Sequence, residues 1–209
     1  MEVLKPLLAL LAIVNPIGAI PFYIHFTQGF SREQRRRTIH VAAIGAFCVI
    51  AVSALVGLRI IEFFGISLAS FQVGGGMLLL VSALQMLNAQ QAESRSDDLR
   101  EGSDKADAGD SIAIVPLTIP LLTGPATIST MVIYAEKTRH WWQLAILVGY
   151  GVVIGLAVWI AFRLSGRIAK ALGQTGINVM TRLMGLLLAA LAVEVMSDGL
   201  VKLFPGLAR

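Results

Sequence analysis

Long apolar runs dominate the pattern of hydrophobic and polar positions along this chain. Five runs contain no Asp, Glu, Lys or Arg, and they cover residues 6–31, 38–58, 63–92, 111–135 and 140–162. A helix that crosses the hydrocarbon core of a bilayer needs about 20 mostly apolar residues, so each run is long enough. A sixth run at 183–193 is shorter and reaches that length only if the span also includes Glu194.

This pattern predicts an all-α integral membrane protein that crosses the bilayer six times. The expected spans are residues 5–28, 38–62, 66–88, 112–135, 142–164 and 181–203. The composition agrees, because 56% of the residues are hydrophobic and only 14% are charged, whereas soluble domains are about 25% charged. The first run is too long for a cleaved signal peptide and follows no clearly basic leader. The lipid bilayer is therefore the first expected partner.

One long polar segment divides the chain into two halves. Residues 89–111 carry seven acidic and three basic side chains, a composition typical of a flexible linker. We expect a first three-helix unit in residues 1–88, a polar cytoplasmic linker in 89–111 and a second three-helix unit in 112–209.

The basic residues predict the orientation of the chain in the membrane. The three loops that follow the first, third and fifth spans hold eleven Lys and Arg, and the other side holds six. Lys and Arg concentrate in cytoplasmic loops, so these three loops are expected in the cytoplasm and both termini in the periplasm. Because the basic residues set orientation, no nucleic-acid partner is expected.

The two halves resemble each other in sequence. At a spacing of 111 residues, Gly65 matches Gly176 and Gly74 matches Gly185, and at a spacing of 109 Pro16 matches Pro125. Each half contains an odd number of spans, so the second half enters the membrane from the opposite side. The sequence therefore predicts an inverted repeat, an architecture common among secondary transporters.

Prolines interrupt the first and fourth spans, which correspond in the two halves. Beyond Pro6 at the entrance of the first span, five of the seven prolines lie within these spans, namely Pro16, Pro21, Pro116, Pro120 and Pro125. Proline removes a backbone donor and breaks a helix interior. Paired, interrupted membrane segments are the best pointer in a sequence to a transporter binding site. We therefore expect both helices to be broken at mid-membrane.

The residues around the breaks predict two new helix starts. Asn15 is a favoured N-cap with Pro16 as the first helical residue, and Thr123 or Gly124 caps a helix that begins at Pro125. In an inverted repeat these N-termini face each other and their free N–H groups suit a carboxylate. The candidate substrate-binding residues are Asn15, Pro16, Gly18, Thr123, Gly124, Pro125, Thr127 and Ser129. The alternative is that the small residues permit close packing and the hydroxyls satisfy freed backbone carbonyls.

The motifs "NPIGAIPF" from Asn15 and "PLLTGPATIS" from Pro120 resemble those of the MarC family, also described as SnatA-like small neutral amino acid transporters. The resemblance covers the whole chain, including the polar central segment. It implies a multi-pass protein of the bacterial or archaeal inner membrane that moves amino acids such as glycine and alanine. Many relatives have glycine after the Gly-Pro pair, whereas this chain has Ala126.

Glu194 is the one acidic residue expected well inside a span, and it has two interpretations. An intramembrane acid is costly and is a functional candidate by default, here either for coupling to a proton or sodium ion or as a partner for a substrate ammonium. Alternatively, it is a hydrogen-bonded residue at a helix contact. The isolated histidines form no metal-ligand pattern, so no metal site and no cofactor are expected.

We therefore expect a secondary transporter that moves a small neutral amino acid by alternating access. A channel for small polar solutes, built from facing half-helices, is the alternative. An enzyme is not expected, because no nucleophile–base set or cofactor loop is visible. The small pair Gly151 and Gly155 suits either helix packing or the interface of a homo-oligomer.

Overall fold

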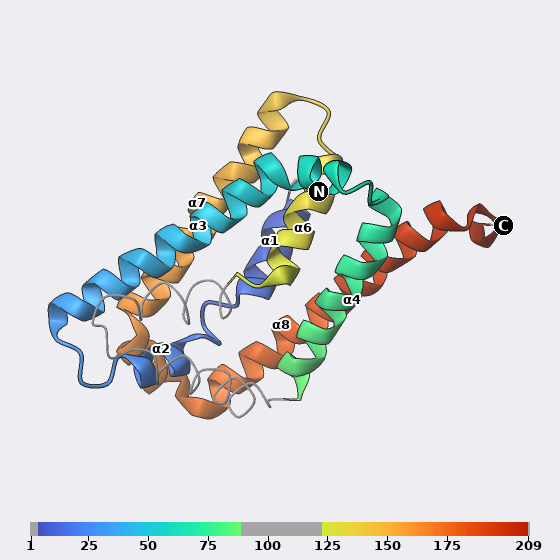
Figure 1. Cartoon of the computed structure of the whole chain (residues 1–209). Helices are drawn as coiled ribbons and strands as arrows, with labels where there is room; N and C mark the ends of the chain where they lie inside the picture. Colours follow the sequence, from blue (N-terminus) through green and yellow to red (C-terminus); the bar gives the residue numbers. More distant parts are fainter. Residues whose placement is uncertain (1–3, 89–122, 209) are drawn as a thin grey trace.

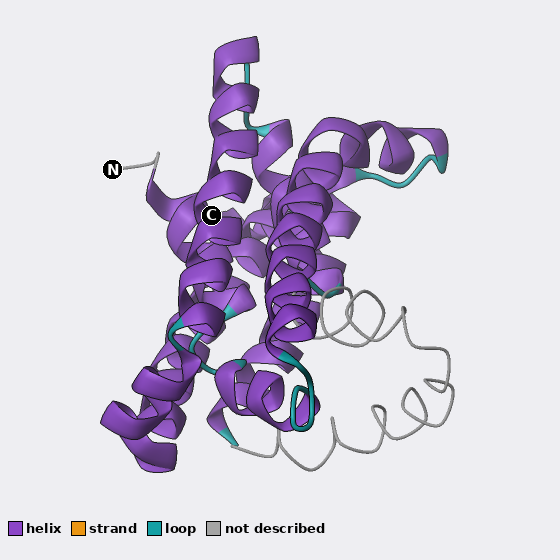
Figure 2. Cartoon of the chain, turned by 90° about the vertical axis from the view of Figure 1, so that its left-hand side faces the viewer, coloured by secondary structure: helices purple, strands orange, loops and turns teal. Residues whose placement is uncertain are grey.

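A computed structural model describes residues 4–88 and 123–208, and these residues form helices joined by short loops (Figure 2). The helices are α1 (Leu4–Val14), α2 (Ile20–Phe26), α3 (Arg32–Phe63), α4 (Leu68–Leu87), α6 (Pro125–Glu136), α7 (Trp141–Arg163) and α8 (Ser165–Leu203), followed by the 3-10 turn η2 (Pro205–Ala208). The linker 89–111, Pro116 and Pro120 lie outside the described residues.

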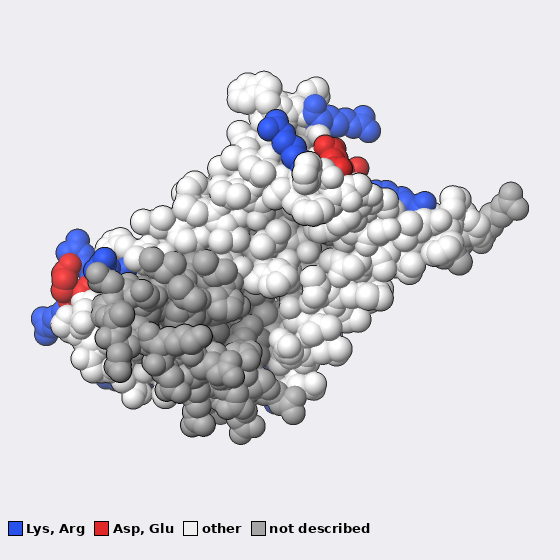
Figure 3. All heavy atoms as spheres, viewed as in Figure 1, with Lys and Arg blue, Asp and Glu red and all other residues white. Residues whose placement is uncertain are grey.

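Four of these helices are long and apolar enough to cross a membrane: α3, α4, α7 and α8. They correspond to the second, third, fifth and sixth predicted spans. α1, α2 and α6 contain 11, 7 and 12 residues, and at 1.5 Å per residue even α6 is only about 18 Å long. None of these three crosses a 30 Å hydrocarbon core alone. Figure 3 shows charged side chains at the ends of the helix bundle, with an uncharged surface between them on the visible face.

The helices pack as two antiparallel pairs around a central pair (Figure 1). α3 lies along α7, α4 lies along α8, and the shorter helices α1 and α6 lie side by side between them. Glycines allow close approach in both outer pairs. A Cβ atom added at Gly155 would lie 2.8 Å from the carbonyl oxygen of Ala43, and one added at Gly185 would lie 3.0 Å from that of Ala83.

Two predicted boundaries are wrong. The loop expected between residues 164 and 181 is helical, and α8 turns within it at Gly173, whose φ of +62° suits glycine. α3 begins at Arg32 instead of residue 38, because Ser31 and Gln34 form a reciprocal capping box. Hydropathy located the membrane-spanning part of each helix but not its polar extension.

Candidate functional site

The first membrane segment breaks at Asn15, between α1 and α2. Asn15 has a φ of +41°, a left-handed conformation that Asn tolerates better than most residues. Its side-chain Oδ1 accepts a hydrogen bond from the Gly18 N–H at 3.2 Å, and its carbonyl accepts one from the Ala19 N–H at 3.1 Å. Asn15 therefore stabilises the turn that follows it, as an N-cap would.

The helix after this turn starts later than the sequence predicts. Residues 16–19 form a turn and α2 begins at Ile20, with Pro21 in its first turn. Pro21 is tolerated there because the first N–H groups of a helix have no intrahelical partner. Pro16 is thus a buried turn residue and not the first residue of a helix.

The second helix start lies where the sequence predicts it. Gly124 is the N-cap of α6 in extended backbone conformation, and Pro125 is the first helical residue. Thr123, one residue earlier, is 1% exposed. The preceding part of the fourth span lies outside the described residues, so only the helix that follows the predicted break is seen.

The break in the first segment lies beside the start of α6. Ile13, near the end of α1, and Ala126, in the first turn of α6, belong to the same buried cluster. α1 runs towards the centre of the bundle and α6 runs away from it (Figure 1). The expected arrangement of two facing helix starts is therefore altered. The start of α6 lies beside the end of α1. The start of α2 is separated from the end of α1 by the turn 16–19.

Polar side chains gather around the break at Asn15 and along the first half of α6. The Asn15 amide Nδ2 donates to Thr181 Oγ1 on α8 at 3.3 Å, and both residues are buried. On α6, Thr127, Ser129 and Thr130 are each at most 5% exposed. The hydroxyls of Thr127 and Thr130 have no hydrogen-bond partner among the described residues. Buried hydroxyls without partners are uncommon, so these two call for an explanation.

Gln72 on α4 is a further buried polar residue whose side chain lacks hydrogen-bond partners among the described residues. It is fully buried, and neither its amide nitrogen nor its amide oxygen has a hydrogen-bond partner among the described residues. One turn along α4, a Cβ atom added at Gly75 would lie 2.9 Å from the Cβ atom of Ser129. Gln72 itself faces α8, because a Cβ atom added at Gly199 would lie 3.0 Å from the Gln72 Cβ atom. We expected Gln72 to be structural, because it lies near a span end, and Thr181 was not a candidate.

Glu194 lies away from these breaks. It is thirteen residues beyond Thr181 on α8, which corresponds to about 20 Å at 1.5 Å per residue. Its carboxylate forms an ion pair with Lys5 on α1 at 3.0 Å, and both side chains are 53% exposed. The sequence did not suggest Lys5 as the partner of Glu194, and the coupling role of Glu194 stays a prediction.

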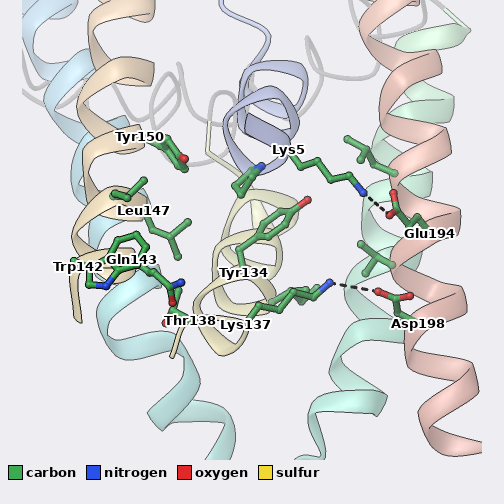
Figure 4. Close-up of a pocket in the computed structure, with 15 residues that line it drawn as sticks. Lys5, Tyr134, Lys137, Thr138, Trp142, Gln143, Leu147, Tyr150, Glu194 and Asp198 are labelled. Carbon is green, nitrogen blue, oxygen red and sulfur yellow. Dashed lines mark hydrogen bonds and ion pairs between the residues drawn. The ribbon is translucent and has the colours of Figure 1, made fainter. Parts of the chain in front are cut away.

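This ion pair lines a cavity of about 260 Å³ near the N-terminus (Figure 4). A second ion pair, Lys137 with Asp198 at 3.4 Å, lies further along the same wall. Tyr134 of α6 lies between the two pairs, and α7 forms the opposite wall. The cavity therefore joins α1, α6 and α8 at the end of the bundle that the charge distribution predicts to be periplasmic.

Sequence comparisons identify the family of the chain. Residues 1–204 match the model for MarC family integral membrane protein. The UPF0056 membrane protein YhcE of Escherichia coli is 35% identical over 206 residues, covering 97% of this chain and 94% of the relative. YvbG of Bacillus subtilis, also a UPF0056 membrane protein, is 35% identical over 202 residues, covering 95% and 93%. A UPF0056 membrane protein of the archaeon Pyrococcus abyssi is 30% identical over 204 residues, covering 96% of each chain.

No solved structure matches this chain significantly. The family match and the relatives extend over almost the whole chain and include both of its broken or interrupted segments. The predicted resemblance is thereby confirmed, and the chain belongs to the MarC family of integral membrane proteins.

Proposed function

We propose that this protein is a secondary transporter of small neutral amino acids such as glycine and alanine. The observation that carries the proposal is the buried polar cluster at the break of the first segment, where Asn15, Gly18 and Thr181 lie together near the start of α6. In lipid, backbone groups at such breaks must face protein or a wet cavity. Interrupted helices at mid-membrane form the substrate sites of many secondary transporters.

The chemistry of the cluster suits a zwitterion. The substrate carboxylate would bind the N–H groups at the start of α6, where the helix dipole favours a negative group. The hydroxyls of Thr127 and Thr130, which have no partner among the described residues, would accept hydrogen bonds from the substrate ammonium.

The space around the break favours a small substrate. A Cβ atom added at Gly18 would lie 2.2 Å from the Asn15 amide nitrogen and 2.6 Å from Thr181 Oγ1. The closely packed residues therefore leave no room for even one more methyl group beside Gly18. Any substrate that binds at this turn would have to displace this contact, and a smaller substrate would displace less of it.

The helix pairs support the inverted repeat. α3 packs on α7, α4 packs on α8 and α1 packs on α6, and these are the members that the two halves place in corresponding positions. Each outer pair is antiparallel (Figure 1), as inversion requires. Alternating access would follow from rocking of one three-helix unit against the other, in an inner membrane with both termini periplasmic.

Gly151 and Gly155 of α7 pack against α3 of the same chain. Cβ atoms added at these positions would meet Phe47 and Ala43 of α3, so their close contact is intramolecular. A homo-oligomer, if it forms, uses another surface.

Uptake into liposomes that contain the purified protein tests the proposal. Radiolabelled alanine should enter with saturable kinetics, and an imposed proton or sodium gradient should raise the rate. A channel for small polar solutes is the alternative, because half-helix ends also line pores. Uptake that rises linearly with alanine concentration and does not change with either gradient would support the channel and contradict the transporter.

A further inference from the structure

A second cavity lies at the opposite end of the bundle from Glu194, where α2, the start of α3, the end of α7 and the start of α8 meet (Figure 1). Its volume is about 460 Å³, and its lining includes Arg32, Arg35 and Arg36 of α3 and Arg163 of α7. None of the described residues that line it is Asp or Glu. These four arginines form no ion pair with a carboxylate of the described residues. A cleft lined by one sign of charge concentrates ions of the other sign.

The cavity lies at the end of the contact between α3 and α7. Along this contact, Gly155 packs against Ala43, and one helical turn further Trp159 and Ile39 line the cavity. The Arg163 guanidinium carbon lies 5.0 Å from the centre of the Trp159 ring. Tryptophan and arginine at a helix end are typical of the membrane–water interface. The cavity is therefore at the depth of lipid headgroups.

The surface next to the cavity continues as exposed apolar side chains. Ile44 lies one turn from His40 on α3 and is 60% exposed, and Leu156 lies about one turn from Trp159 on α7 and is 55% exposed. In a membrane protein such surfaces face acyl chains. The arginines therefore sit beside a surface that lipid tails cover, which favours a lipid over a free anion as the source of negative charge.

We propose that this cavity binds the phosphate group of an anionic phospholipid, with its acyl chains along α3 and α7. Guanidinium groups form paired hydrogen bonds with phosphate oxygens, and Trp159 and Phe162 supply apolar walls. Basic pockets between membrane helices bind anionic headgroups in this way. The charge distribution predicts that this end is cytoplasmic. The site is separate from the proposed substrate site, and its proposal does not depend on what the protein transports.

Lipid binding to the full-length protein tests this inference. Native mass spectrometry in a neutral detergent would follow titrations with phosphatidylglycerol, phosphatidylcholine and inorganic phosphate. The test variant combines Arg32→Gln, Arg36→Gln and Arg163→Gln. The control variant combines Arg59→Gln, Arg139→Gln and Lys202→Gln, which removes the same charge from exposed positions away from the cavity.

Phosphatidylglycerol should bind the wild-type protein in preference to phosphatidylcholine. Its affinity should fall by at least about tenfold in the test variant, since each arginine near a membrane surface contributes about 1 kcal/mol, and it should be unchanged in the control. Equal affinity in the test variant and wild type, or an equal loss in both variants, would overturn the proposal. Displacement of the lipid by inorganic phosphate at the same concentration would also overturn it and indicate a free-anion site.

A fluorescence measurement keeps the test independent of the arginine variants. The chain has three tryptophans, so Trp141→Phe with Trp142→Phe leaves only Trp159. Phosphatidylglycerol with brominated acyl chains should quench Trp159 at a lower mole fraction than brominated phosphatidylcholine does. Equal quenching by the two lipids would overturn the proposal even if the arginine variants fail to fold.

Discussion

Asn15 combines two properties that no other residue type supplies together at the break. Its backbone adopts a φ of +41°, and its amide links the turn at Gly18 to Thr181 on α8. Glycine would satisfy the backbone but would remove the amide, whereas alanine would satisfy neither requirement. Substitution at this position can therefore separate the effect of the backbone conformation from the effect of the amide hydrogen bonds.

We predict that Asn15→Gly folds but binds alanine at least about tenfold more weakly. The lost side-chain hydrogen bonds leave a buried N–H unpaired, which costs about 1–3 kcal/mol. Both variants should unfold at a lower temperature than the wild type, and Asn15→Ala should unfold at the lowest temperature, because its Cβ atom also disfavours the positive φ. Scintillation-proximity binding and thermal unfolding in detergent measure the two effects. Wild-type affinity in Asn15→Gly would show that the amide has no role in binding.

Thr127 distinguishes a binding hydroxyl from a structural one. Its hydroxyl is fully buried and has no hydrogen-bond partner among the described residues. Thr127→Val should keep or raise the unfolding temperature, because an unpaired buried hydroxyl is unfavourable. The same variant should bind alanine more weakly. A drop in unfolding temperature with unchanged alanine affinity would assign the hydroxyl to folding.

At the scale of the elements, close contact between α4 and α8 depends on one face of a triple-glycine run. A Cβ atom added at Gly76 would lie 2.4 Å from Met196 Cγ and 3.1 Å from the Ala192 carbonyl oxygen. Gly74, two residues away on the same helix, has nothing within 4 Å of such an atom. The two glycines therefore form a matched pair for substitution.

We predict that Gly76→Ala destabilises the protein by about 1–3 kcal/mol, the usual cost of overpacking a close contact. Gly74→Ala should leave the stability unchanged or raise it, because alanine favours a helix more than glycine does. Thermal unfolding of both variants in the same detergent gives the comparison. Equal behaviour of the two variants would mean that α4 and α8 do not approach at Gly76.

The sequence predicted some elements well and others poorly, for identifiable reasons. α4 and α7 match their predicted spans within a few residues, because apolar length and flanking polar residues define both ends. Pro125 marked the start of α6, because proline at the first helical position and Gly124 before it are local signals. The start of α2 at Ile20 was missed, because the positive φ of Asn15 begins a turn over residues 16–19 that delays the helix.

At the scale of the whole molecule, long-range packing decides which polar residues meet. Gln72 and Thr181 reach the interior through helices that the sequence alone does not orient, so neither could be selected from composition. Glu194 was selected as an unusual acid, but its partner Lys5 is 189 residues away and could not be predicted. The sequence therefore predicted the types of residue at the site better than their arrangement.

The Lys5–Glu194 ion pair connects α1, the helix that breaks at Asn15, to α8. We propose that protonation of Glu194 releases Lys5 and thereby couples ion movement to α1. Glu194→Gln should then abolish the dependence of alanine uptake on an imposed pH gradient. Asp198→Asn is the matched control, because Asp198 forms a similar ion pair with Lys137 in the same cavity. Retained coupling in Glu194→Gln, or equal loss in both variants, would refute this role.

The most direct test of the central claim measures whether substrate reaches the start of α6. Cys48 is the single cysteine of the chain, so Cys48→Ser with Thr127→Cys places one thiol beside the proposed site. In a variant that still takes up alanine, a small membrane-impermeant thiol reagent should label this cysteine, and saturating alanine should protect it. Labelling at the same rate with and without alanine, in a protein that continues to transport it, would contradict a substrate site between the broken segments.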